Sequence, residues 1–443
     1  MSPLFRNAPA GWRTIRLKDT VTACRNGLWG DDPDGSTENL ICVRVVDFDR
    51  LKLRVSLENP TLRLIPRSQR HGRILSAGDL LLEKSGGGDA QPVGMVVLYQ
   101  QHAQAVCSNF IARMPVATGY DPRYLCYLHA ALYTLGVTRR FMNQTTGIQN
   151  LDSAAYLAES VKVPELNQQR RLTHWLDGKL DLLDSLICAR ERQADLLFEK
   201  RDAIVSRAIV RGLEPSVSLR QTGISSMPEI PFRWQMTRLK YVRSGCLLYG
   251  SSEPASTENQ GVRLIRITDI DDNGTLRKAS PQSLEPDLAK PYRLRDGDLL
   301  LARSGATVGK AIRYRADWGP ACFASYLIRV RPDQRKIHPD FLRYYTQSRA
   351  FRQEVRLAAV QATIANVSAE RYANFPVPLP PLEEQCRIVE FLDGTMAALQ
   401  TAAGTMRRQI DVFREYRRAL IVTAVTRGCC GVADALSEGV CAG

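Results

Sequence analysis

The chain contains one stretch of sequence twice. Its first motif recurs after 222 residues, where Trp12, Arg16 and Leu17 match Trp234, Arg238 and Leu239. From residue 113 onward the offset is 216 and stays constant, as in the pairs Arg113 and Arg329, Asn150 and Asn366, Pro164 and Pro380, and Gln169 and Gln385. This period is far longer than that of solenoid repeats. The chain therefore contains two copies of one domain. If one copy binds a ligand, we expect the other copy to bind a ligand of the same kind.

Composition indicates an ordinary globular protein. The 443 residues are 44% hydrophobic and 24% charged, and no apolar run has the roughly 20 residues that a membrane span needs. The N-terminus lacks a signal-peptide layout. The 11 cysteines show no metal-ligand spacing, which favours a reducing compartment and buried thiols. We expect a cytoplasmic protein without a membrane segment.

The excess positive charge is confined to two blocks. The net charge is +14, of which residues 1–164 carry +5 and residues 217–380 carry +10. Residues 165–216 are neutral and residues 381–443 carry −1. A basic surface attracts polyanions at long range, and nucleic acid is the commonest of them. The two blocks therefore predict two nucleic-acid-binding domains.

Each block alternates apolar runs of strand length with turns rich in Gly and Asp. Runs at residues 40–46, 79–82 and 93–99 have counterparts at 262–267, 298–301 and 326–330. Shorter helical patterns follow at about 122–142 and 339–358. We expect a mixed α/β (α+β) domain with a curved sheet, present twice.

A long helix follows each block, with Pro164 and Pro380 at the starts and Gly212 and Gly428 at the ends. Apolar residues in both helices alternate at spacings of four and three, which is a coiled-coil pattern. Each helix would be about 65 Å long at 1.5 Å per residue. The residues expected to pair are Leu176, Leu180, Leu183, Ile187, Leu197 and Ile204 in the first helix, and Leu392, Met396, Leu399, Ile410, Phe413 and Leu420 in the second.

The two helices are expected to pair with each other, in antiparallel orientation, because the linker from Gly212 to about Trp234 is too short to retrace a helix. Pairing with a second subunit is the alternative. The predicted architecture is two similar globular domains separated by a long antiparallel two-helix coiled coil, with a pseudo-twofold internal repeat. The predicted boundaries are residues 1–163, 164–214, 215–379 and 380–428, with a tail at 429–443.

A glycine-rich loop follows a strand in each block and carries a cation and a serine. Such a loop lets the backbone approach a phosphate, although a tight turn would also need glycine. The segment from Gly305 to Lys310 is one residue too short for a P-loop, and Ala311 replaces the magnesium-binding hydroxyl. The candidate DNA-binding residues here are Lys84, Ser85, Gly86 and Gly87 in the first copy, and Arg303, Ser304, Thr307 and Lys310 in the second.

A second segment in each block is rich in amide and hydroxyl side chains, which can read base edges or cap a turn. Asn150 and Asn366 share one register, which favours a structural role for that pair. Positions that differ between copies are better candidates for base reading, such as Gln149 against Ala365. The candidates are Asn143, Gln144, Thr145 and Gln149 in the first copy, and Gln361 and Thr363 in the second.

No catalytic constellation is apparent. The sequence lacks a methyl-transfer motif of the Asn-Pro-Pro-Tyr type and a glycine-rich cofactor loop that opens a helix, and the five histidines have no metal-ligand spacing. We therefore predict no catalytic residue, no metal site and no cofactor in this chain. A nuclease or methyltransferase with unrecognised motifs is one rival interpretation. A coiled-coil interaction scaffold that does not bind DNA is another.

The chain resembles the specificity subunits of type I restriction–modification systems over nearly its whole length. The most specific element is the proline-rich helix entry at residues 374–385, Asn-Phe-Pro-Val-Pro-Leu-Pro-Pro-Leu-Glu-Glu-Gln, of which residues 161–169 are a degraded copy. The Gly-Asp-Leu-Leu segments at residues 78 and 297 and the Arg-Ser-Gly segment at residue 303 also fit.

The resemblance implies a non-catalytic DNA-binding subunit with two target-recognition domains, each reading one half of a split double-stranded DNA site. It implies two methyltransferase (modification) subunits around the helices and one or two restriction/translocase subunits. S-adenosylmethionine, ATP and Mg²⁺ would then belong to those partners. A methyltransferase-only (orphan) role, without a restriction partner, is the variant interpretation.

Overall fold

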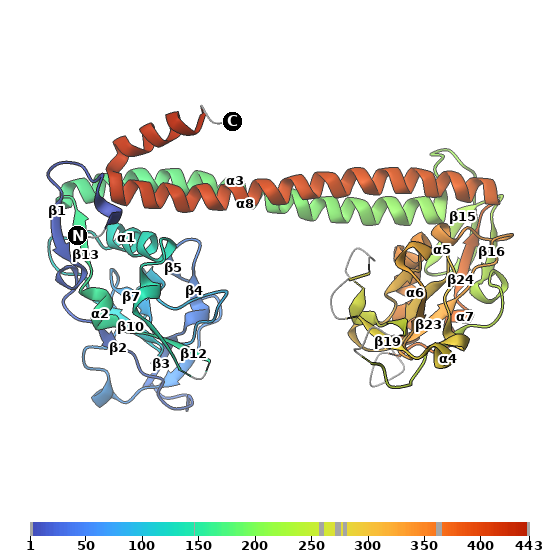
Figure 1. Ribbon diagram of the computed structural model, residues 1–443, viewed down its shortest axis with the longest axis horizontal. Coiled ribbons are helices and arrows are strands. Elements are labelled where there is room, and N and C mark those ends of the chain that lie inside the picture. The colour runs from blue at the N-terminus through green and yellow to red at the C-terminus, as the bar shows by residue number, and fades with distance from the viewer. Residues whose placement is uncertain are drawn as a thin grey trace. The chain divides into compact units, whose positions relative to one another are not determined.

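The computed structural model describes residues 3–145, 147–256, 261–270, 276–277, 281–359 and 366–440, with the backbone alone for Pro3, Gln144, Thr145 and residues 429–440. The chain forms two compact units. Unit 1 consists of Met1–Arg190 with Arg408–Gly443, and unit 2 consists of Glu191–Arg407. Each unit contains one globular block and a part of each long helix (Figure 1).

Unit 1 is built around a six-stranded sheet in the order β2-β10-β7-β8-β5-β4, beside a three-stranded sheet β6-β3-β9 and the pairs β1-β13 and β11-β12. Its strands are β1 (Arg13–Arg16), β2 (Arg25–Asn26), β3 (Asn39–Val43), β4 (Phe48–Asp49), β5 (Arg54–Val55), β6 (Leu62–Leu64), β7 (Leu80–Glu83), β8 (Val96–Leu98), β9 (Ala105–Cys107), β10 (Ile111–Met114), β11 (Met142–Thr145), β12 (Ile148–Leu151) and β13 (Ser160–Val163). Its helices are α1 (Pro122–Thr134), α2 (Ser153–Leu157) and the start of α3 (Leu166–Arg211).

Unit 2 has a four-stranded sheet β17-β23-β20-β21, a three-stranded sheet β19-β18-β22 and the pairs β16-β24 and β14-β15. Its strands are β14 (Leu219–Ile224), β15 (Met227–Pro231), β16 (Gln235–Arg238), β17 (Leu248–Tyr249), β18 (Val262–Ile265), β19 (Gln282–Leu284), β20 (Leu299–Ala302), β21 (Ala311–Arg313), β22 (Ala321–Phe323), β23 (Leu327–Val330) and β24 (Pro376–Leu379). Its helices are α4 (Pro286–Ala289), α5 (Pro339–Gln347), α6 (Arg349–Ala359), α7 (Ala369–Ala373) and the start of α8 (Leu382–Val440).

The two blocks share one topology, which confirms the predicted mixed α/β class and the duplication. The order β2-β10-β7-β8 matches β17-β23-β20-β21, and each three-stranded sheet contains one parallel pair, β3 with β9 and β18 with β22. In each block a strand near the start pairs with the strand that precedes a long helix, β1 with β13 and β16 with β24. Each long helix is thereby attached to the start of its own block.

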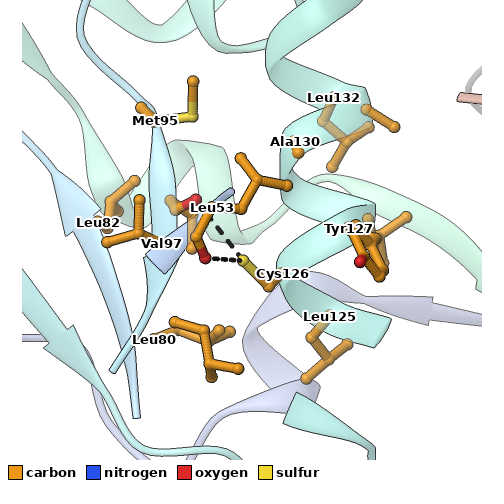
Figure 2. Packing of buried hydrophobic residues seen from close by; sticks show 14 of the residues in the cluster. Leu53, Leu80, Leu82, Met95, Val97, Leu125, Cys126, Tyr127, Ala130 and Leu132 are labelled. Carbon is orange, nitrogen blue, oxygen red and sulfur yellow. Dashed lines mark hydrogen bonds between the residues drawn. The ribbon is translucent and has the colours of Figure 1, made fainter. Parts of the chain in front are cut away.

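The core of unit 1 lies between the sheet and α1. Both faces of β7 are buried, so Leu80, Leu81 and Leu82 are all inaccessible, as their continuous apolar run requires. Figure 2 shows α1 against these strands, with the Cys126 thiol donating to Leu53 O at 3.5 Å and Val96 O at 3.7 Å. The equivalent strand β20 is also buried along its whole length.

A buried glutamine secures the start of each long helix in the same way. Gln169 Nε2 donates to Pro164 O at 2.8 Å, and its Oε1 accepts from Asp121 N, at the start of α1, at 2.9 Å. Gln385 donates to Pro380 O at 2.8 Å and accepts from His338 N, at the start of α5, at 2.7 Å. The glutamine pair found at the 216 offset therefore couples the long helices to the short ones.

Several predicted boundaries were wrong. The strands expected at 40–46 and 262–267 end at Val43 and Ile265, because Asp47 and Asp269 accept the backbone N–H groups of Arg44 and Arg266 and close tight turns. The helix expected to reach 142 ends at Thr134, where Gly136 has a φ of +71° and Val137 N donates back to Leu132 O. Residues 142–145 form β11 instead.

The second short helix is divided into α5 and α6 at Ser348, which has an extended backbone and whose hydroxyl accepts from Phe351 N at 3.3 Å. The linker expected between 212 and 234 is the hairpin β14-β15, which contributes Met227 and Ile230 to the core of unit 2. Both findings correct the sequence-based expectation, which was one continuous helix at about 339–358 and a linker without a hairpin. Local hydroxyl capping and long-range burial determine both features.

The long helices α3 and α8 pack together in each unit and run antiparallel. In unit 1 the first part of α3 packs against the last part of α8, through Leu176, Leu180 and Leu183 with Leu420, Ile421 and Ala424. In unit 2 the last part of α3 packs near the first part of α8, through Val205, Ala208 and Ile209 with Ile388 and Leu392.

None of the twelve predicted pairing residues is exposed. Leu176, Leu180, Leu183, Ile187, Leu392, Ile410 and Leu420 are buried, and Leu197, Ile204, Met396, Leu399 and Phe413 are half-buried. Helix α3 ends next to Gly212. Helix α8 is interrupted at Gly428, with a φ of 74°, but a further helical segment follows to Val440, which the expected helix end at Gly428 did not anticipate.

The cysteines are divided between the core and the surface. Among the described cysteines, Cys42, Cys107, Cys126 and Cys322 are buried, whereas Cys24, Cys188, Cys246 and Cys386 are exposed. The expectation that most cysteines are buried is therefore not met among the described ones, half of which are exposed. No helix within the described ranges is both long and apolar enough to cross a membrane.

Candidate nucleic-acid interface

In each block the glycine-rich loop lies next to the recurring asparagine of the second segment that the sequence singled out. In unit 1, Ser85 forms a bridge with Asn150, and the Ser85 hydroxyl donates to Asn150 Oδ1 at 2.5 Å. In unit 2, Ser304 forms the same bridge with Asn366. The serine and asparagine that recur in both copies therefore have a shared structural position, as the constant register of the asparagines suggested.

Lys84 lies at the end of β7, beside an exposed aromatic residue. Its ammonium donates to Asn26 Oδ1 at 2.8 Å, and its backbone N–H donates to Phe110 O at 2.8 Å. The Phe110 side chain is 45% exposed. An ammonium group has three donors, and the Asn26 contact uses one of them. Lys84 is therefore positioned by a neutral partner and retains donors for an anionic or carbonyl group.

Arg303 occupies the equivalent position in unit 2. Its backbone N–H donates to Tyr326 O at 3.0 Å, and its guanidinium lies 4.8 Å from the centre of the Tyr249 ring. The Tyr326 side chain is 66% exposed. We call these two sites the cation–aromatic corners: Lys84 with Phe110 in unit 1, and Arg303 with Tyr326 in unit 2.

The glycine-rich loops have different conformations in the two units. Gly86 N donates to Gln149 O at 3.1 Å, and a Cβ at Gly87 would lie 2.7 Å from backbone atoms of Gln91 and Val93. Close backbone approach is thus sufficient to require a glycine at position 87. In unit 2 the loop forms a 3₁₀ turn, Gly305–Thr307, that leaves Thr307 exposed.

Lys310 points back into unit 2, where its Nζ donates to Ile270 O at 3.2 Å. The glycine-rich loops therefore differ in what they expose, although the cation at their start is placed alike. We regard Lys84 and Arg303 as the better-placed cations of the predicted set.

The hairpin β11-β12 lies beside Lys84, because Leu151 N donates to Lys84 O at 2.8 Å. Asn143 is exposed on this hairpin, opposite Asn150. Gln149 is only 5% exposed, and its Oε1 accepts from Val93 N at 3.4 Å. A buried amide of this kind cannot reach a base edge, so we leave Gln149 out of the interface. Gln144 and Thr145 are described by backbone only, and Gln361 and Thr363 lie outside the described residues.

Some of the positive charge serves the fold. Arg113 Nε lies 2.6 Å from Asp79 Oδ2, and Arg331 Nη2 lies 2.7 Å from Asp298 Oδ2. The hydrogen bond to Asp298 raises the pKa of Arg331, whereas burial together with the neighbouring Arg331 lowers that of Arg329. Arg113 and Arg331 thus neutralise buried carboxylates at the sheet, so the net charge of a block overstates the charge available for DNA.

The sequence alone did not point to the aromatic residues of the two corners, Phe110 and Tyr326, or to the residues that hold the cations, Asn26 and Tyr249. Phe110 and Tyr326 are separated by the constant offset of 216, which could have identified them as a pair. Asn26 and Tyr249 are separated by 223, in a region where insertions obscure the match. Among the residues that the structure describes, no group of three or more His, Cys, Asp or Glu side chains is arranged to hold a metal ion.

Comparison with known proteins gives one consistent relationship. A profile described as "Type I restriction modification DNA specificity domain" matches residues 251–404. The type I restriction enzyme StySPI specificity subunit of Salmonella potsdam is 25% identical over 423 residues, covering 91% of this chain and 85% of that protein. The putative type I restriction enzyme MjaX specificity subunit of Methanocaldococcus jannaschii is 27% identical over 209 residues, covering 45% of this chain and about half (47%) of that protein.

Two solved structures share the fold. One, described as "Structural basis underlying complex assembly and conformational transition of the type I R-M system", has a TM-score of 0.71 at 19% identity and covers 95% of this chain and 99% of its own. The HsdS subunit from Thermoanaerobacter tengcongensis has a TM-score of 0.50 at 19% identity and covers 95% of this chain and 98% of its own.

Proposed function

Because this chain belongs to the specificity subunits of type I restriction–modification systems, a family of non-catalytic DNA specificity subunits, we propose that it reads a bipartite double-stranded DNA site, one half with each globular block. The observation that supports this most directly is the repeated cation–aromatic corner. The same backbone geometry presents Lys84 with Phe110 in unit 1 and Arg303 with Tyr326 in unit 2. One scaffold thus offers two different chemical surfaces.

The chemistry of the corners suits base recognition. Lys and Arg donate to guanine in the major groove, Arg in a two-pronged geometry, and apolar or aromatic side chains contact the thymine methyl group. Arg303 is restrained by the Tyr249 ring and Lys84 by the Asn26 amide. Restrained side chains lose little entropy on binding, so they discriminate between bases better than mobile ones. We place Asn143, Ser304 and Thr307 at the edges of these surfaces.

We propose that the long helices dock two modification subunits and set the distance between the half-sites. In support, apolar side chains remain exposed on the helix parts of each unit: Leu182, Leu186 and Val412 in unit 1, and Leu196, Phe198 and Phe391 in unit 2. Exposed apolar groups on a helix pair mark a protein interface when they cluster. Half-sites read from one side of the duplex would have centres about one turn, or roughly 10 base pairs, apart.

The remaining partners follow from the family. One or two restriction subunits would complete a type I enzyme, and their absence would make this chain an orphan methyltransferase subunit. S-adenosylmethionine, ATP and Mg²⁺ would be bound by those partners, in the cytoplasm. The chain would then contribute sequence choice and assembly.

The test exchanges the corners one at a time. Lys84→Ala with Phe110→Ala, and separately Arg303→Ala with Tyr326→Ala, are expressed with the modification subunits, and genome-wide adenine methylation is mapped. Each double variant should relax one half-site by about 10- to 100-fold, because a specific base contact contributes about 1–3 kcal/mol, and leave the other half unchanged.

Two results would contradict the proposal. If both variants keep the wild-type methylation pattern, the corners do not read DNA. If either variant alters both half-sites alike, the assignment of one half-site to each block is wrong. A scaffold that does not bind DNA is separated by the wild-type protein, which should bind the mapped duplex in a salt-dependent manner and a scrambled duplex weakly.

A further inference from the structure

One ion pair between the long helices in unit 1 is not repeated at the equivalent described positions of unit 2. Arg417 Nε of α8 lies 2.8 Å from Asp184 Oδ1 of α3, and Arg417 is only 4% exposed. The 216 offset relates Arg417 to Arg201 and Asp184 to Gln400. In unit 2 the arginine is therefore retained, and an amide stands where the repeat predicts its carboxylate.

Arg201 makes no hydrogen bond or ion pair with any residue that the structure describes, and it borders a cavity. The cavity has a volume of about 430 Å³ and lies between α3, α5 and α8. Its lining combines apolar and basic residues: Leu197, Phe198, Met396, Leu399 and Ala403 with Arg201, Arg343 and Arg407, together with Gln347, Gln400, Tyr344 and Gly404.

Two of the three arginines that line this cavity have no carboxylate partner among the described residues. Arg343 already pairs with Asp340 at 2.8 Å and Asp393 at 3.1 Å, but Arg407, like Arg201, has no partner among the described residues. No Asp or Glu is among the described residues that line the cavity. The corresponding hollow of unit 1, about 230 Å³, is lined by Asp177, Asp181 and Asp184 as well as by cations. The cavities of unit 1 and unit 2 thus differ in charge, although residues at equivalent positions line part of each.

We propose that the cavity of unit 2 receives an Asp or Glu side chain of a docked modification subunit, whose carboxylate takes the place that Asp184 fills beside Arg417 in unit 1. This inference rests on the proposed function. A carboxylate between Arg201 and Arg407 would make charge-assisted hydrogen bonds, which are about twice as strong as neutral ones. It would also cover Phe198, which is 48% exposed.

A protein carboxylate fits better than a DNA phosphate. Phosphate contacts are made mostly on open polar surfaces. Here half of the lining is apolar, from Leu197, Phe198, Met396 and Leu399, and an acidic side chain within an apolar protein surface matches both parts of the lining. The two copies of the modification subunit are consequently held by different contacts, and only the copy on unit 2 inserts an acid.

The decisive variant is Gln400→Asp, which supplies the missing carboxylate from within the chain. It should pair with Arg201, as Asp184 does with Arg417, and weaken binding of one modification subunit about 10- to 100-fold, as expected for losing a hydrogen bond to a charged group. Gln400→Asn is the matched control and should bind as wild type. Arg201→Gln should weaken the same copy. Native mass spectrometry of the full-length chain titrated with modification subunit resolves the first and second binding steps.

Each outcome is decisive. Loss of one copy with Gln400→Asp and Arg201→Gln, but not with Gln400→Asn, supports the proposal, provided that hydrogen exchange in α3 and α8 is no faster than in wild type. Two copies bound with wild-type affinity by Gln400→Asp overturn it. Reduced DNA affinity with unchanged subunit binding also overturns it, because the cavity would then hold a phosphate. A wild-type chain that binds no modification subunit contradicts the proposed function itself.

Discussion

The pair Arg417 and Asp184 allows the strongest quantitative prediction. The Arg417 side chain is 5% exposed and that of Asp184 is 15% exposed. Removing one partner of a buried ion pair costs about 3–5 kcal/mol, because the other charge stays buried without compensation. Asp184→Ala leaves the more deeply buried charge, so we expect a loss of about 3 kcal/mol in the local stability of the helix pair.

Replacing both partners should cost far less. In Asp184→Leu with Arg417→Met the helices bury apolar groups of similar size in place of the two charges, a change that is often neutral or stabilising. The ion pair would then contribute register and orientation more than stability, as polar residues at coiled-coil core positions do. Arg417→Met alone should be milder than Asp184→Ala, because Asp184 retains some contact with water.

Hydrogen exchange followed by mass spectrometry is the suitable assay, because a chain of two units need not unfold in one step. A loss of about 3 kcal/mol corresponds to roughly 100-fold faster exchange of amides in residues 176–190 and 410–424 of Asp184→Ala. Residues 197–208 of α3 serve as the internal reference. If Asp184→Ala speeds exchange less than about threefold, or if the double variant is as unstable as the single one, the reasoning fails.

Two further predictions concern buried polar groups. In unit 1, Glu83 is 2% exposed and its two carboxylate oxygens accept from Arg50 Nη2 at 2.9 and 2.8 Å, while burial raises its pKa. Arg50→Met should destabilise unit 1 by about 3–5 kcal/mol at neutral pH. In this variant the folded state binds the Glu83 proton more tightly than the unfolded state does. The free energy of unfolding should therefore rise as pH falls toward the ordinary glutamate range, more steeply than in wild type. Urea unfolding at several pH values measures this, and adding Glu83→Gln to the same chain should abolish the dependence. Gln169→Met leaves two backbone groups unpaired and should cost about 2–4 kcal/mol. Gln385→Met leaves three unpaired, because the Gln385 amide also donates to Lys336 O at 3.0 Å, and should cost at least as much. Each substitution should speed hydrogen exchange only in its own unit, at the start of α1 or of α5, and equal effects in both units would contradict this.

The sequence predicted the features that depend on periodicity and repetition. The alternating spacing of four and three identified the packed face of α3 and α8, and the constant offset paired Gln169 with Gln385 and Asn150 with Asn366. These patterns survive because helix contacts recur every turn. The Gly-Asp-Leu-Leu segments likewise marked β7 and β20, since strands buried on both faces need continuous apolar runs.

The features that the sequence did not predict depend on contacts between distant residues. Gln149 resembles a base reader in sequence, but the fold buries it against Val93, 56 residues away. The hairpin β14-β15 lacks a strong turn signal and is stabilised by burial of Met227 and Ile230. Asp184 lies next to Leu183, outside the apolar seam, so only the structure shows that it reaches Arg417. Periodicity gives the face of an element, whereas the partner across that face depends on tertiary packing.

Comparing the two copies position by position separates the roles of residues. Positions that keep both identity and contacts, such as Gln169 with Gln385, serve the shared fold. Positions that keep their backbone place but change side chain, such as Lys84 with Arg303 and Phe110 with Tyr326, are the ones to which we assign the reading of different DNA in the proposed function. The pair Asp184 and Gln400 represents a third kind of position. The arginine that Asp184 contacts in unit 1, Arg417, is retained as Arg201 in unit 2, but Gln400 there offers no carboxylate. The fold of unit 2 alone gives no reason for Arg201 to lack a carboxylate partner, because a single aspartate, Asp184, is enough to pair with the equivalent Arg417 in unit 1. We therefore attribute it to a contact made by one docked subunit and not by the other.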